Sequence, residues 1–146
     1  MPRVDVELVL TAPIAKVWEA IKSVEAYPSY MSTVRSVEVL DTDGAKRTCA
    51  WSVLLKGSIL QWTEIDVIHD ERWTIEFDQI DGDLDQFVGF WSATPQADGT
   101  VRTRLLVDFE IGIPVLADML NPVAARALAE NAETMLREIE SRLRAA

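Results

Sequence analysis

The sequence predicts an α+β domain in which a curved, seven-stranded antiparallel sheet wraps around a long C-terminal helix. Three observations lead to this fold class. Apolar and polar residues alternate at residues 3–10. From Val34 to about Ile113 six strand-like segments are separated by short turn signals, and the chain then changes to a helical period. A chain of 146 residues is the size of one domain, so we expect a single domain over residues 1–146.

The N-terminal region predicts a strand followed by two short helices. Residues 3–10, RVDVELVL, alternate as a half-buried strand does, and Pro13 suits the first turn of a helix. The helix is predicted by apolar residues at the spacing of one helical face, which are Ile14, Val17, Trp18 and Ile21. Pro28 interrupts this spacing, so we expect a second short helical turn or a loop that carries Tyr27, Tyr30 and Met31.

Five short turn signals divide the middle of the chain. They are Asp43-Gly44, Lys56-Gly57 and the segments 69–71, 81–83 and 97–99. Turns of this length join antiparallel neighbours, so residues between Val34 and about Ile113 should form a meander of six strands. Together with the first strand they make seven.

The C-terminal region predicts a helix of about twenty residues, roughly 30 Å long. We expect a break at Asn121-Pro122, after which apolar residues keep to one face: Val123, Ala127, Leu128, Met135 and Ile139. One long helix on a flat sheet would leave much apolar surface in water, so the sheet should be concave. A cavity between helix and sheet is then the expected ligand site.

Composition and charge exclude several classes of function. The formal net charge is −10 and no basic cluster is present, which argues against nucleic-acid binding and against stable association with an anionic membrane. The single cysteine, Cys49, excludes an intrachain disulfide. The N-terminus lacks the regions of a signal peptide, so a cytoplasmic protein is expected. No phosphate-binding loop, dinucleotide fingerprint or His/Cys metal set occurs, and we expect no cofactor and no metal.

The segment SILQWTEIDVIHD, residues 58–70, predicts a strand with two mixed faces. One face carries Leu60, Trp62, Glu64, Asp66 and Ile68. The other carries Ile59, Gln61, Thr63, Ile65 and Val67. The pattern alone leaves open whether the two carboxylates point into the core or into solvent.

Three stretches carry a resemblance to a known family, and together they span nearly the whole chain. They are TAPIAKVWEAIKSVEAYPSYM, GDLDQFVGFWSATPQADGT, and DFEIGIP followed by the C-terminal helix. The sequence resembles the START-related helix-grip (SRPBCC) superfamily, and within it most resembles the polyketide aromatase/cyclase and coenzyme Q-binding START-type branch. The resemblance implies a helix-grip domain that encloses one hydrophobic ligand between the sheet and the C-terminal helix.

The resemblance also bears on the orientation of the strand at residues 58–70. In similar cyclases the tryptophan aligned with Trp62 points into the cavity, which implies that Glu64 and Asp66 point inward too. The chain departs from those cyclases at two positions. It has Asp66 where they carry a pocket arginine and Val34 where they carry a tyrosine.

Two inward carboxyl groups would be suited to acid–base chemistry. Neighbours two apart on a strand lie roughly 7 Å from each other, where two negative charges repel by about 2.4 kcal/mol at an effective dielectric of about 20. One carboxyl group of the Glu64 and Asp66 pair should therefore keep its proton while the other is ionised. An aldol cyclisation with loss of water needs such a pair, and we expect Glu64 to be the base.

The candidate ligand-binding residues are mostly aromatic, and for each of them an ordinary core position is the alternative. Those expected to form the cavity walls are Trp51, Trp62, Phe77, Phe87 and Trp91. The other candidates are Tyr27, Met31, Gln79, Gly89, Asn131 and Met135. Among these, Gly89 marks a bend or makes room for a bulky group, and the Asn131 amide either binds a ligand carbonyl or is satisfied within the protein.

Two functions are consistent with these features. The first is a cofactor-independent cyclase, aromatase or dehydratase acting on a polyketide-like or aromatic substrate. The alternative is a non-enzymatic protein that binds or transports a lipid, a quinone or another hydrophobic small molecule. Both have a hydrophobic small molecule as partner, and the sequence is compatible with a homodimer.

Overall fold

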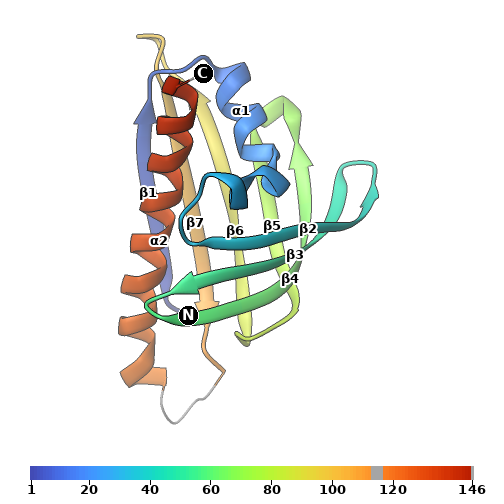
Figure 1. Ribbon diagram of the computed structural model, residues 1–146, viewed down its shortest axis with the longest axis vertical. Coiled ribbons are helices and arrows are strands. Elements are labelled where there is room, and N and C mark those ends of the chain that lie inside the picture. The colour runs from blue at the N-terminus through green and yellow to red at the C-terminus, as the bar shows by residue number, and fades with distance from the viewer. Residues whose placement is uncertain (113–116, 146) are drawn as a thin grey trace.

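The computed structural model describes residues 1–112 and 117–145, and its central element is one antiparallel sheet of seven strands (Figure 1). The strands are β1 (Arg3–Leu10), β2 (Val34–Asp43), β3 (Lys46–Leu55), β4 (Ser58–His69), β5 (Thr74–Gly82), β6 (Gln86–Pro95) and β7 (Val101–Glu110). Their order in the sheet is β1-β7-β6-β5-β4-β3-β2, so the six-strand meander is confirmed and its last strand pairs with β1. The strand end expected at about Ile113 lies outside the described residues.

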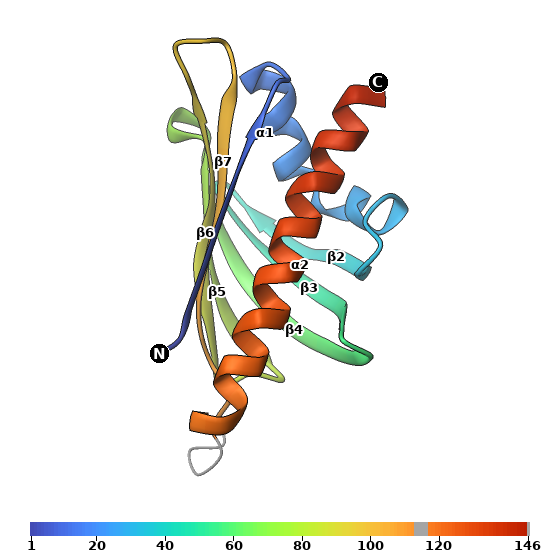
Figure 2. The ribbon, with the colours of Figure 1, turned by 90° about the vertical axis from the view of Figure 1, so that its left-hand side faces the viewer.

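The sheet curves strongly and holds the helices on its concave side. Strands β2, β3 and β4 run across the direction of β1, β6 and β7 (Figure 1). Helix α1 (Ile14–Lys22), the 3₁₀ helix η1 (Val24–Ser29) and helix α2 (Ala117–Ala145) all lie on the same side of the sheet (Figure 2). The predicted α+β architecture is therefore confirmed, including the two short helices after the first strand.

Helix α2 is longer than the sequence indicates. It has 29 residues, or about 44 Å at 1.5 Å per residue, and it continues through Pro122. The expected break at Asn121-Pro122 is therefore wrong, because proline is tolerated close to the N-terminal end of a helix, where few carbonyl groups precede it. Val123, expected on the inner face, is 68% exposed. Leu128, Met135 and Ile139 are buried as expected, Ala127 is half-buried, and the helix also buries Ala132 and Leu136.

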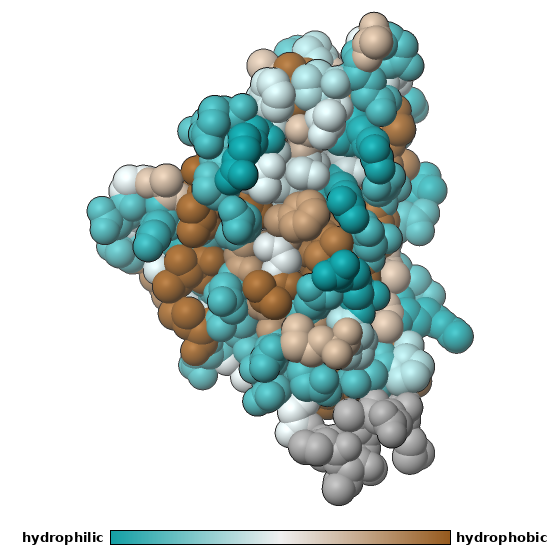
Figure 3. Space-filling model, turned by 180° about the vertical axis from the view of Figure 1, so that it is seen from behind, coloured by the Kyte–Doolittle hydropathy of each residue, from teal (hydrophilic) through white to brown (hydrophobic). Residues whose placement is uncertain are grey.

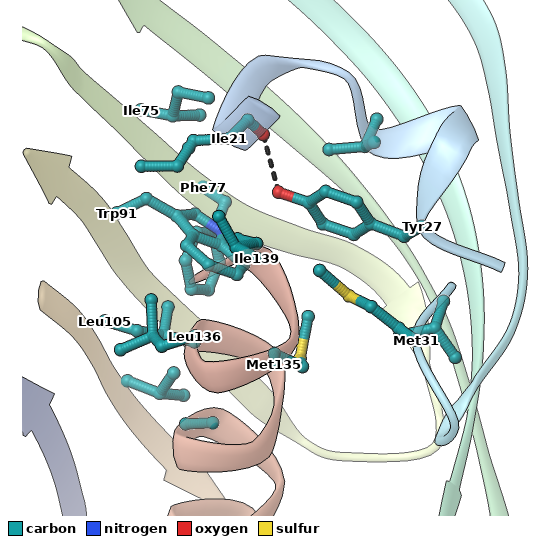
Figure 4. Packing of buried hydrophobic residues seen from close by; sticks show 14 of the residues in the cluster. Ile21, Tyr27, Met31, Ile75, Phe77, Trp91, Leu105, Met135, Leu136 and Ile139 are labelled. Atoms are coloured by element: carbon teal, nitrogen blue, oxygen red, sulfur yellow. Dashed lines mark hydrogen bonds between the residues drawn. The ribbon is translucent and has the colours of Figure 1, made fainter. Parts of the chain in front are cut away.

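The apolar core fills the space between α1, α2 and the concave face of the sheet. Residues from β5, β6 and β7, including Ile75, Trp91 and Leu105, lie opposite Leu136 and Ile139 of α2 (Figure 4). All of these are buried. Burial of this apolar surface is the main stabilising contribution to the fold.

The outer face of the sheet is largely polar. Cross-strand ion pairs join β1 to β7: Arg3 to Asp108 and Arg104 to Asp5, at 2.8 and 2.7 Å, and Arg102 to Glu7. Seen from behind, hydrophilic residues surround small groups of apolar ones (Figure 3). No helix among the described residues combines the length and the apolar character that crossing a bilayer requires.

Gly89 lies where two strands approach closely on the concave face. A Cβ atom at this position would lie 1.9 Å from the backbone oxygen of Leu106 and 3.0 Å from Cζ of Phe77. A backbone oxygen cannot move aside as the end of a side chain can. The absence of a side chain at Gly89 therefore makes room for the backbone of β7 and the ring of Phe77, and a role of Gly89 in ligand binding stays a prediction.

We expect Gly89→Ala to destabilise the protein by about 3 kcal/mol, because the added methyl group forces β6 away from β7. Urea unfolding followed by tryptophan fluorescence measures this change. Gly44→Ala is the matched control, since nothing lies within 4 Å of its Cβ and only the left-handed backbone, at φ +60°, is penalised, by about 1 kcal/mol. Equal losses in the two variants would contradict the close approach at Gly89.

Candidate functional site

A cavity of about 40 Å³ lies between the sheet and α2. Its aromatic wall is built from stacked and tilted rings on neighbouring strands. Trp51 of β3 stacks on Trp62 of β4, with centroids 5.5 Å apart and planes 6° apart, and Trp62 is 4.9 Å from Phe87 of β6. A volume of this size holds a few water molecules but no ring system. A larger ligand therefore has to displace side chains as it enters.

Eight of the residues expected at the site line this cavity. They are Trp51, Trp62, Glu64, Phe77, Phe87, Trp91, Asn131 and Met135. Sequence reasoning missed several aliphatic residues of the lining, namely Val53, Leu55, Leu60, Leu105, Val107, Leu128 and Ala132. Their positions in the strands and in α2 gave no signal beyond that of an ordinary core. The role of the eight in ligand binding remains a prediction.

The other expected residues lie near the cavity without lining it. Tyr27 is buried and its hydroxyl group donates a hydrogen bond to the backbone oxygen of Ile21 at 2.6 Å (Figure 4). Met31 is buried and faces Met135 (Figure 4). The Gln79 amide donates to the backbone oxygen of Leu84 at 2.7 Å. Gly89 and Asp66 likewise do not contribute to the lining.

The two carboxylates of β4 point inward. Glu64 is 3% exposed and Asp66 is 1% exposed, while Gln61 on the opposite face is exposed. Glu64 lines the cavity, and its Oε1 atom accepts a hydrogen bond from Nε1 of Trp62 at 2.7 Å. The alternative of two solvated carboxylates, which the pattern alone left open, is therefore excluded.

Arg47 of β3 is the polar residue that the sequence analysis missed. Its Nε atom lies 2.7 Å from Oδ2 of Asp66, and its Nη1 atom donates to the backbone oxygen of Lys22 at 2.7 Å. The side chains of Arg47 and Asp66 are only 10% and 2% exposed, so this is a buried ion pair. An arginine does stand beside the carboxylates, but it comes from the neighbouring strand.

The turn between β3 and β4 indicates which residue of β4 Arg47 faces. Lys56 and Gly57 both have positive φ, 49° and 81°, as a two-residue hairpin turn of type I′ requires. Such a turn determines the register of both strands. Counting outward from it places Arg47 directly opposite Asp66, as observed.

Burial is the main reason that the pKa of Glu64 lies well above its ordinary value. The hydrogen bond with Asp66 and the charge of Asp66 raise this pKa further, whereas the N–H group of Trp62 and the charge of Arg47 lower it. Burial also raises the pKa of the Cys49 thiol to about 12, so Cys49 is unsuited to act as a nucleophile. Glu64 therefore keeps its proton to a higher pH than an exposed glutamate does, in a cavity whose other polar lining residue among those described is Asn131.

Asn131 of α2 is held between two neighbours. Its Oδ1 atom accepts a hydrogen bond from the hydroxyl group of Thr33, and its Nδ2 atom has the thioether sulfur of Met135 at 3.4 Å. A thioether is a weak acceptor, so the amide N–H groups retain capacity for a stronger partner. Over the described part of the chain, no group of three or more His, Cys, Asp or Glu residues is arranged to hold a metal ion.

The curved sheet, the long helix and the mostly apolar cavity between them define a helix-grip protein. The family described as polyketide cyclase / dehydrase and lipid transport matches residues 10–136, and the chain belongs to this family. No protein with a curated function matches the chain by sequence.

Solved structures from other organisms share the fold. The protein TTHA0849 from Thermus thermophilus is 28% identical, covering 99% of this chain and 98% of its own, with a TM-score of 0.91. The Zhui aromatase/cyclase from a Streptomyces species is 18% identical over 98% and 93% of the two chains, with a TM-score of 0.84. A START superfamily protein from Mycobacterium smegmatis is 16% identical over 97% of each chain, with a TM-score of 0.81.

Arg47→Met should reduce the free energy of unfolding by about 3 kcal/mol, because it leaves the Asp66 carboxylate buried without its cation. The double variant Arg47→Met/Asp66→Asn should recover most of this loss, since the uncompensated charge is removed as well. Chemical denaturation of these two variants and of Asp66→Asn alone measures the coupling. Arg137→Met, which breaks the exposed pair with Glu133, is the control and should cost less than about 0.5 kcal/mol. Purely additive effects at residues 47 and 66 would contradict a buried pair.

The raised pKa of Glu64 predicts how stability depends on pH. The folded protein keeps this proton at pH values where the unfolded chain has lost it, so the stabilisation is complete below the ordinary pKa of 4.5 and is lost as pH rises through the folded pKa. The amide introduced by Glu64→Gln cannot ionise. The stability of the wild type relative to this variant should therefore fall as pH rises above the ordinary pKa of 4.5, by about 1.4 kcal/mol for each pH unit up to the folded pKa of Glu64. A difference that stays constant with pH would contradict the assignment.

Proposed function

We propose that the protein is a cofactor-independent cyclase or dehydratase that acts on a polyketide-like or aromatic precursor enclosed between the sheet and α2. One observation carries this proposal. A protonated carboxyl group, Glu64, lines an aromatic cavity, and the ion pair of Asp66 and Arg47 lies beside it. A neutral acid in an apolar cavity is what a reaction needs when it protonates a carbonyl or a departing hydroxyl group.

Glu64 serves this chemistry as an acid that recovers its proton. In ring closure, the enol carbon of one part of the substrate forms a bond to a carbonyl carbon of another part. Glu64 gives its proton to that carbonyl oxygen and takes one from the enol oxygen. In the following dehydration it protonates the departing hydroxyl group, which leaves as water, and takes the proton lost from the adjacent carbon. The role of base expected from the sequence is kept in the two steps in which Glu64 takes a proton, and the raised pKa adds the role of acid.

Asp66 and Arg47 act as positioning residues in this proposal. Asp66 does not line the cavity, and its carboxylate is paired with Arg47, so in this proposal it acts on Glu64 through its negative charge, which raises the pKa of Glu64. The stacked Trp51 and Trp62 and the ring of Phe87 hold the flexible precursor with its reacting carbons in contact. Holding two reacting groups in this way lowers a barrier by several kcal/mol without a special nucleophile.

A carrier of hydrophobic molecules is the second candidate function. The lining favours it too, because apart from Glu64 and Asn131 its side chains are aliphatic or aromatic or carry a thioether. The family description includes lipid transport beside cyclisation and dehydration. In a carrier, Glu64 would only hydrogen-bond the ligand, and the ligand would leave unchanged.

The probe 1-phenylhexane-1,3,5-trione separates these two functions, because its aldol closure gives 3,5-dihydroxybiphenyl with loss of one water molecule. The wild type should accelerate this conversion, measured by liquid chromatography. Glu64→Gln should lower the rate at least about 100-fold, since the proton donor is lost, while the dissociation constant changes less than about threefold.

Glu76→Gln is the matched control for this experiment. Glu76 lies on β5 with its side chain 57% exposed, and the variant should keep full activity. Binding of the trione without conversion by the wild type would favour the carrier. Full activity of Glu64→Gln would eliminate Glu64 as the acid.

A further inference from the structure

The indole N–H group of Trp51 is a buried donor without an acceptor. Trp51 is 5% exposed, and its Nε1 atom has no hydrogen-bonding partner in the residues that the structure describes. Two other tryptophans do have acceptors: Nε1 of Trp62 donates to Glu64 at 2.7 Å and Nε1 of Trp18 donates to Asp70 at 2.8 Å. A buried donor that lacks a partner costs about 1–3 kcal/mol, so its retention calls for an explanation.

The surroundings of Trp51 offer rings and no acceptor among the described residues. Trp62 stacks on one side of it, and Tyr27 packs against it in an edge arrangement with centroids 5.8 Å apart. The Tyr27 hydroxyl group is already bound to the backbone oxygen of Ile21. Because Trp51 also lines the cavity, a ligand in the cavity can supply the acceptor.

A second donor reaches the cavity from the opposite side. Asn131 of α2 lines the cavity, and its Nδ2 atom has only the thioether of Met135 as an acceptor among the described residues. Trp51 belongs to the sheet and Asn131 to the helix, so the two donors approach a ligand from the two layers that enclose it. Thr33 orients the Asn131 amide through its oxygen.

The described lining of the cavity offers no cation to an anionic ligand. Glu64 is the one titratable side chain among these residues. Arg47 does not belong to the lining, and its Nε and Nη1 atoms are bound to Asp66 and to the backbone oxygen of Lys22, whereas its Nη2 atom has no partner among the described residues. An ionised carboxylate or phosphate in such a cavity would lose its hydration without gaining a counter-ion. The lining therefore selects against fatty-acid anions and against lipid headgroups that carry a negative charge.

We infer that Trp51 and Asn131 form a carbonyl-binding subsite, and that the ligand is a neutral, flat molecule with carbonyl oxygens directed at both. This inference rests on the proposed function and adds to it the two N–H donors, one from the sheet and one from the helix, that would orient a carbonyl-bearing ligand. Entry of such a molecule requires the cavity to widen. The flexible side chains of Met31 and Met135, which face each other at the side of η1, are suited to move aside (Figure 4).

Fluorenone and fluorene test the subsite, because both are neutral three-ring molecules and only fluorenone has a carbonyl group. Titration calorimetry should show that the wild type binds fluorenone about tenfold more tightly than fluorene, and that it does not bind dodecanoate comparably. Trp51→Phe keeps an aromatic ring and removes the donor. It should weaken fluorenone binding about tenfold and fluorene binding less than about twofold. Phe87→Leu, a wall residue without a donor, is the control and should weaken both by the same factor.

Nuclear magnetic resonance of the wild type tests the same subsite without a variant, so the test stays decisive if Trp51→Phe does not fold. The indole N–H proton of Trp51 should move downfield with fluorenone and stay unchanged with fluorene. An unmoved resonance at saturating fluorenone, or no fluorenone binding at all, would overturn the inference. The proposed catalysis is tested separately. If fluorenone shifts the Trp51 resonance but the trione is not converted, the subsite is supported and the proposed enzymatic activity is contradicted.

Discussion

The buried ion pair between Arg47 and Asp66 is the interaction on which the polar part of this molecule depends. It joins β3 to β4, and a second hydrogen bond from Arg47 to the backbone oxygen of Lys22 extends it to α1. Removing two charges from water is costly, and their attraction offsets that cost only when the geometry is good and other hydrogen bonds assist. The pair thereby keeps a negative charge beside Glu64, and this charge helps to keep Glu64 protonated.

Much of the fold follows from local patterns in the sequence. Short turn signals such as Lys56-Gly57 predict the antiparallel meander because a two-residue turn can only join adjacent strands. The inward position of Glu64 and Asp66 cannot be predicted from the alternation alone, because both faces of β4 are mixed. The prediction depends on the family resemblance, which places Trp62 in the cavity. The full length of α2 is harder to predict, because Pro122 indicates a break, whereas its position near the helix terminus makes it tolerable.

The site is less predictable because it depends on contacts between strands. Arg47 and Asp66 are 19 residues apart in the sequence, and the residues around either one do not indicate that the other lies beside it. The register of the hairpin relates them, but only after the turn type is known. The size of the cavity is not predictable at all, since it depends on how closely Trp51, Trp62 and Phe87 pack. The exact packing of individual side chains does not follow from the periodicity of the sequence.

The small cavity and the raised pKa of Glu64 are two consequences of the same exclusion of water. Tight aromatic packing desolvates the carboxyl group, which keeps its proton, and it also leaves the Nε1 donor of Trp51 without an acceptor among the described residues. A sequence selected for stability alone would satisfy or remove such a group. A ligand that displaces a few apolar side chains and brings its own oxygen would satisfy this donor without admitting water. The acid would then remain protonated at the moment when a substrate could use it.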